Sequence, residues 1–140
     1  MILPSKELLS EILDIEEGYI ELARCDKDST ICYQYTRNAN TEDESIEYHF
    51  VNIYELAHKV KEWAVKQHKE NKENNNGNHF YLNHFGSTLV GFFENYQAEI
   101  GYRGTDRDGD WADLQIIFTE RTEPEAIFRA GEWILGKLNG

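Results

Sequence analysis

The stretch around Gly109 has the residue types most able to do chemistry. It contains four closely spaced carboxylates: Asp106, Asp108, Asp110 and Asp113. Carboxylates at alternate positions can surround a hard cation such as calcium, because this ion prefers oxygen ligands. An EF-hand loop counted from Asp106 requires Gly at its sixth position and Glu at its twelfth, where this chain has Trp111 and Ile117. We therefore interpret the stretch as a polar β-turn and assign no metal ligand.

The histidines and serines do not form a recognisable catalytic motif. The histidines are His49, His58, His68, His79 and His84. None occurs in a His-Glu-x-x-His pattern, which would place two metal ligands on one helical face. The chain also lacks the glycine-rich phosphate-binding loop and the Gly-x-Ser-x-Gly elbow of hydrolases. We assign no catalytic residue and no cofactor-binding residue, and expect no cofactor.

Cys25 and Cys32 flank a segment of turn composition, Asp26–Ser29. A hairpin closed at this turn places Cys25 opposite Cys32. The same register places Leu22 opposite Tyr35. Cross-strand residues have Cα atoms ~4.5–5.5 Å apart, which is close enough for a disulfide. A redox-responsive pair and two reduced thiols both remain open, and the rarity of disulfides in cytosolic proteins favours the thiols.

Length and charge restrict the class of protein. The chain has 140 residues, which indicates a single domain over residues 1–140. Its formal net charge of −12 repels nucleic acid and anionic membranes, so we expect neither as a partner. The chain has no apolar run of ~18 residues and no signal-peptide pattern, which favours the cytoplasm. The acidity suits a basic protein partner or mimicry of nucleic acid.

The clearest predicted helix covers Thr122–Gly140. Thr122 and Glu125 have the spacing of a capping box, and Pro124 falls in the first turn, where its missing N–H costs nothing. One apolar stripe follows at helical spacing: Ala126, Ile127, Ala130, Ile134 and Leu138. Gly131 and Gly136 interrupt this helix, and we interpret both as points of close packing.

Two earlier helices are also predicted. Ser5 can cap a short helix that ends near Gly18, and Asn52 can cap a long helix that ends near Glu70. A loop over Asn71–Asn78 should follow, because Asn and Gly resist helix and strand alike. The expected buried stripe of the long helix is Leu56, Val60, Trp63 and Ala64.

Alternating hydrophobicity predicts seven strands. They cover Tyr19–Cys25, Ile31–Thr36, Ile46–Phe50, Phe80–Phe85, Thr88–Glu94, Gln97–Arg103 and Trp111–Glu120. A turn centred on Gly109 sets Ile116 opposite Tyr102 and keeps Leu114, Ile116 and Phe118 on the core face. The predicted fold class is α+β, a two-layer antiparallel sheet with helices packed on one face.

The two long helices resemble each other at a fixed offset. Asn52, Glu55 and Trp63 align with Thr122, Glu125 and Trp133, and a strand precedes each helix. The chain can therefore be read as a tandem β-β-β-α duplication or as two unrelated amphipathic helices.

Three segments carry a resemblance to a known group of proteins. Asn52–Ala64, Thr122–Ile134 and Leu8–Leu13, about a quarter of the chain, resemble small phage- and prophage-encoded bacterial proteins without an assigned function. The resemblance implies a bacterial cytoplasm, and it brings no activity and no functional residues.

Three functions are compatible with these features. The first is a non-enzymatic, acidic, phage-like accessory protein that acts by binding another protein. The second is a metal-dependent or small-molecule enzyme that uses Asp106, Asp108 and their neighbours. The third is an immunity or antitoxin-like inhibitor of a basic protein, which is a special case of the first. A homodimer is compatible with each of them.

Overall fold

The computed structural model describes residues 2–15, 20–23, 30–37, 45–74, 81–91, 95–105 and 107–139. Its elements, in chain order, are α1 (Lys6–Leu13), β1 (Ile20–Ala23), β2 (Thr30–Arg37), β3 (Ser45–Asn52), α2 (Ile53–Asn74), β4 (Tyr81–Val90), β5 (Asn95–Thr105), β6 (Trp111–Glu120) and α3 (Glu123–Asn139). The predicted α+β class is confirmed. Within the described ranges, no helix combines the length and apolar character that a membrane crossing requires.

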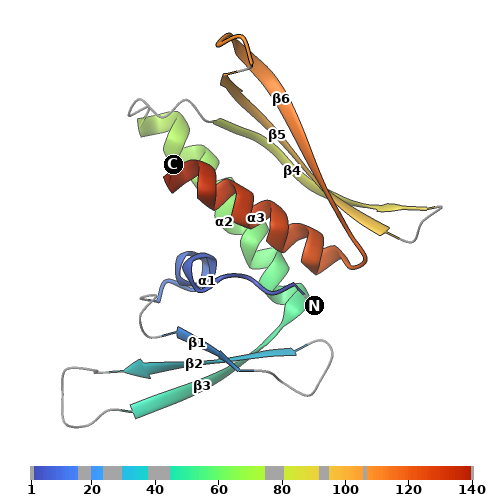
Figure 1. The fold of residues 1–140 in the computed structure, drawn as a ribbon. Helices are drawn as coiled ribbons and strands as arrows, with labels where there is room; N and C mark the ends of the chain where they lie inside the picture. Colours follow the sequence, from blue (N-terminus) through green and yellow to red (C-terminus); the bar gives the residue numbers. More distant parts are fainter. Residues whose placement is uncertain are drawn as a thin grey trace.

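The strands form two antiparallel sheets, in the orders β1-β2-β3 and β4-β5-β6 (Figure 1). Helices α2 and α3 pack on one face of the β4–β6 sheet, as expected. The second sheet was not predicted. This is the β1–β3 sheet, which lies beside α1, on the other side of α2 and α3 from the β4–β6 sheet (Figure 1).

The prediction of two strands between Phe80 and Glu94 was wrong, because β4 runs without a break through Gly86 and Ser87. Ser87 remains in the strand because it pairs with Ala98 of β5. Its hydroxyl also accepts a hydrogen bond of 2.8 Å from Lys61 Nζ of α2. The strand pairing with β5 and the hydrogen bond from α2 together outweigh the preference of the Gly-Ser sequence for a turn.

Both predicted hairpin registers are wrong by two residues. Leu22 lies opposite Tyr33 rather than Tyr35. Tyr102 lies opposite Leu114 rather than Ile116. A shift of two leaves each side chain on its predicted face, because side chains alternate with period two. The inward positions of β6 are therefore still the half-buried ones: Ala112, Leu114, Ile116, Phe118 and Glu120.

The corrected register changes the cysteine prediction. Cys32 lies opposite Ala23 in the β1–β2 pair. Cys25 lies outside the described residues. The pairing of Cys25 with Cys32 was derived from the wrong register, so that derivation no longer supports a redox pair.

The predicted N-terminal caps are confirmed at all three helices. Ser5 Oγ accepts from the Leu8 N–H at 3.1 Å. Asn52 Oδ1 accepts from the Tyr54 N–H at 2.9 Å. Thr122 Oγ1 accepts from the Glu125 N–H at 3.4 Å. Each bond satisfies one of the four N–H groups left free at a helix start.

The predicted C-terminal ends of α1 and α2 were wrong. Helix α1 ends at Leu13 rather than near Gly18, because Asp14 adopts a left-handed conformation with φ 55°. The Asp14 N–H donates to the Ser10 carbonyl, which closes the helix. Helix α2 continues to Asn74, so the first part of the predicted Asn71–Asn78 loop is helical.

The core lies between α2, α3 and the inner face of β4–β6, and α1 closes it from the other side. Both predicted helical stripes are confirmed, although Leu138 is only partly buried. Phe128, outside the predicted stripe, is fully buried. Trp133 packs against Tyr102 of β5, with ring centroids 4.8 Å apart.

The two glycines of α3 differ in their surroundings. A Cβ at Gly131 would lie 2.7 Å from Val60 Cγ1 and 3.1 Å from Leu8 Cδ2. The prediction of close packing is therefore confirmed for Gly131. It was wrong for Gly136, where a Cβ would meet no atom within 4 Å.

The tandem duplication is not supported. The element order passes twice through three strands and a helix. The aligned tryptophans nevertheless have different neighbours, since Trp63 lines a pocket beside α1 and Trp133 packs on β5.

A candidate binding groove between α1 and α2

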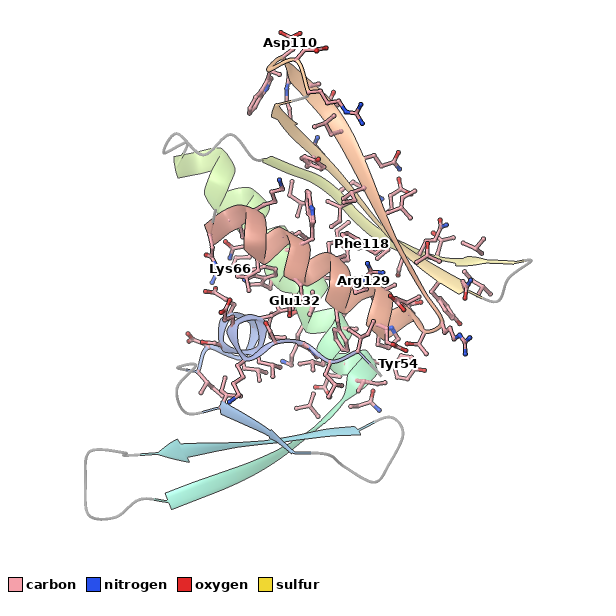
Figure 2. All side chains as sticks on the ribbon, in the orientation of Figure 1. Tyr54, Lys66, Asp110, Phe118, Arg129 and Glu132 are labelled. Atoms are coloured by element: carbon pink, nitrogen blue, oxygen red, sulfur yellow. The ribbon has the colours of Figure 1, made fainter. Side chains whose placement is uncertain are left out.

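The aspartate cluster lies at the tip of the β5–β6 hairpin, far from the helices, where Figure 2 labels Asp110. Gly109 supplies the positive φ of 81° that the turn requires. Asp106 lies outside the described residues. Within the described ranges, no three His, Cys, Asp or Glu side chains come close enough to hold a metal ion.

The structure does not bring the described histidine side chains together. His58 on α2 lies 2.8 Å from Glu62, one turn further along the same helix. His84 is exposed on β4. Backbone positions alone are described for His49 in β3 and His68 in α2, and His79 lies outside the described residues.

A groove lies between α1 and α2. Its volume is ≈ 550 Å³, and its lining residues are Glu11, Ile12, Asp14, Lys59, Glu62, Trp63, Lys66 and Gln67. A smaller pocket of ≈ 270 Å³ shares Glu11 and Asp14 with it and is completed by Ser10 and Ile15. We call the two together the α1–α2 groove.

The α1 side of the groove is acidic. Glu11 and Asp14 line both pockets, and Glu7 lies one helical turn before Glu11 on α1 without lining either pocket. All three are exposed. None forms a side-chain hydrogen bond or ion pair with the described residues. These carboxylates are therefore available to an incoming cation.

The α2 side combines charged and apolar groups. Lys59 and Lys66 contribute two ammonium groups, and the Glu62 carboxylate is paired with His58. Trp63 is only 6% exposed, and Ile12 on α1 is half-buried. The Trp63 Nε1 atom is buried and has no hydrogen-bond acceptor among the described residues. The groove thus has an apolar wall below a rim of charges.

Two glutamates of α3 hold the segment that leads into α1. Glu132 accepts from the Ser5 N–H at 2.7 Å and from the Ser5 hydroxyl at 3.0 Å. Glu125 accepts from the Ile2 N–H at 3.1 Å. Figure 2 labels Glu132 on α3 beside this segment. These bonds, together with the buried Leu8 and Leu9, position α1 against α2.

Reasoning from the sequence missed this arrangement. Glu125 was assigned only to the capping box, and nothing in the local pattern distinguishes the half-buried Glu132 from the exposed glutamates of the helices. The acidic stripe of α1 could have been found, because Glu7, Glu11 and Asp14 follow helical spacing on a helix that was predicted correctly at its start.

Comparisons of the chain with protein-family models, with curated proteins and with solved structures gave no match. The groove must therefore be interpreted from its own chemistry.

We expect the Asp14 carboxylate to lower the free energy of unfolding. It lies at the negative end of the α1 dipole, and the last turn of α1 contains no basic residue. Asp14→Asn keeps a side chain that tolerates the left-handed conformation. We expect this change to raise the free energy of unfolding by about 0.3–1 kcal/mol at low salt, measured by urea denaturation.

Glu7 supplies the control for this prediction, because it lies in the first turn of the same helix, where a carboxylate is favourable. Glu7→Gln should lower the free energy of unfolding by a similar amount. If both variants change stability in the same direction, the dipole argument is wrong.

Proposed function

We propose that this chain is a non-enzymatic protein-binding module whose α1–α2 groove receives a lysine or arginine side chain of a basic partner. The observation that carries the proposal is the pair of exposed carboxylates that line the groove beside Trp63, Glu11 and Asp14, which have no partner among the described residues. A long basic side chain fits such a site, because its methylene stem can lie on the apolar wall while its charge meets the carboxylates.

The overall charge supports the same kind of partner. A formal net charge of −12 steers a basic surface toward this chain over distances longer than any single contact. The association rate should therefore fall as salt is added, since salt screens exposed charges.

The biological setting is part of the proposal. We place the chain in a bacterial cytoplasm as a phage-like accessory protein, on the resemblance of its helical segments alone. An immunity or antitoxin-like inhibitor is a special case, since covering the basic surface of an enzyme would inhibit it.

The experiment is capture of partners from a bacterial lysate at low and high salt, followed by titration of the purified partner. The test variant combines Glu11→Gln with Asp14→Asn. The matched control combines Glu55→Gln with Asp113→Asn, which removes the same charge from exposed positions outside the groove. Hydrogen bonds to charged groups contribute about 1.5–3 kcal/mol each. We therefore expect the test variant to raise Kd at least about tenfold.

The control variant should raise Kd much less than the test variant. Equal losses would mean that net charge, and not the groove, attracts the partner. If no protein is captured at either salt concentration, or if binding does not respond to salt, the proposal of a basic partner fails.

A further inference from the structure

The outer edge of β6 is an unpaired border of the β4–β6 sheet. In the strand order β4-β5-β6, β6 pairs only with β5 among the described strands, and Figure 1 shows it at the border of the sheet. A border strand presents a row of backbone N–H and C=O groups that can pair with another strand. An additional β-strand would therefore satisfy the backbone hydrogen-bonding groups of this edge.

The two borders of this sheet differ in how well they are protected. The register of β4 shifts between Leu82 and His84, an irregularity that disturbs pairing at that border. In contrast, β6 pairs regularly with β5 from Trp111 to Glu120, with neither bulge nor proline nor lysine. Natural proteins usually protect a free edge with such features. The edge of β6 has none of these three features, and its charged side chains are Asp113 on the outer face and Glu120 on the inner face.

The side chains of β6 are compatible with a second copy of the same strand. In an antiparallel pair centred on Ile116, that residue faces its own copy, and Leu114 faces Phe118 of the other chain. Gln115 then faces Ile117, and Asp113 faces Thr119. The two carboxylates of β6, Asp113 and Glu120, both face uncharged residues. A two-fold axis perpendicular to the sheet relates two identical strands in this antiparallel arrangement, and the resulting interface uses the same surface of both copies.

We propose that the chain forms a homodimer by antiparallel pairing of β6 with β6 of a second copy, which joins two three-stranded sheets into one. The helices of both copies lie on the same face of the joined sheet. Helix α1 lies on the other side of α2 and α3 from this sheet (Figure 1), and the α1–α2 groove is lined by α1 and α2. A dimer would therefore leave both grooves accessible, and the inference does not depend on the proposed function.

Salt separates this association from binding to a basic partner. Two copies with a formal charge of −12 each repel one another, and salt screens that repulsion. The homodimer should therefore become stronger as salt is added, whereas binding of a basic partner should become weaker. The two proposals can consequently fail independently.

The test is sedimentation velocity of the full chain over a range of concentrations and salt. The expected species at high concentration is twice the 16.4 kDa monomer. Ile117 is 47% exposed on the outer face of β6, so substitution there should leave the fold intact, which circular dichroism would verify. Ile117→Asp places the new carboxylates of the two copies diagonally across the two-fold axis, and each is also diagonal to Asp113 of the other copy. We expect it to raise the dimer Kd about tenfold or more.

Charge sign and position provide the controls. Ile117→Lys removes the same apolar side chain but brings an ammonium group near Asp113 of the other copy, so it should leave dimer affinity within about threefold. Leu89→Asp places a charge at a 56% exposed residue of β4, and dimerisation should be unaffected. If Ile117→Asp fails to fold, Thr119→Asp replaces it, because that position faces Asp113 of the other copy.

Three results would overturn the proposal. The first is a monomer at every concentration and salt. The second is a dimer that Ile117→Asp or its replacement does not weaken. The third is equal weakening by Ile117→Asp and Ile117→Lys, because the proposed register distinguishes the two charges.

Discussion

Replacing Phe128 with Ala should lower the free energy of unfolding by about 3–5 kcal/mol, the usual cost of emptying a fully buried phenylalanine site. Phe128 has no exposed surface, and it is the largest of the fully buried side chains in the described part of the chain. It lies in α3 between Ala126 and Ala130, which are also fully buried. Small neighbouring side chains cannot extend into the space that the ring leaves, so the cavity should remain.

This loss would be a large fraction of the 5–15 kcal/mol by which a typical domain is stable. Urea or thermal denaturation monitored by circular dichroism would measure it. The control is Tyr54→Ala, which removes another aromatic ring, from a residue that is 59% exposed at the start of α2 (Figure 2). That change should stay within about 0.5 kcal/mol. Similar losses for both variants would contradict the assignment of Phe128 to the core.

The second large effect is expected at Gly131, where three helices meet. Gly131→Leu would force four carbon atoms into space occupied by Val60 of α2 and Leu8 of α1, both fully buried. Neither neighbour can turn toward solvent, and the branched Val60 has few alternative rotamers in a helix. We expect a loss of about 3 kcal/mol or more, the upper part of the range for overpacked cores.

Gly136 is the matched control, because it lies in the same helix and a Cβ there meets no atom within 4 Å. Gly136→Leu should stabilise the protein by up to about 1 kcal/mol, since Gly is a poor helix former. Combining Gly131→Leu with Val60→Ala should cost less than the sum of the two single changes, because the smaller residue relieves the clash. Simple additivity would show that Val60 is not the obstacle.

The local features of the fold could be predicted because they depend on neighbours in sequence. The caps at Ser5, Asn52 and Thr122 each join residues two or three positions apart. The bounds of β6 agree with the predicted Trp111–Glu120. Its inward face was also correct, because side-chain alternation follows from strand geometry alone.

The features that were mispredicted depend on contacts outside the local window. Both hairpin registers were off by two residues, because a hydrophobic pattern of period two cannot distinguish such shifts and the turn decides between them. Gly86 and Ser87 resemble a turn, yet pairing with β5 keeps them in β4. Gly131 and Gly136 are both glycines within the same predicted helix. They differ only in the tertiary structure, where α2 and α1 pack against Gly131 and not against Gly136.

By itself, then, the sequence determined the α+β class, the helix starts, the inward face of β6 and the acidic character of the chain. These follow from propensity, periodicity and charge, which act locally or are independent of fold. Only the tertiary structure decided that the strands form two sheets, that α1 and α2 enclose a groove, and that Glu132 holds Ser5 across 127 positions of the chain. Such contacts depend on which surfaces meet, and burial in the packed core selects among pairings that the local pattern allows equally.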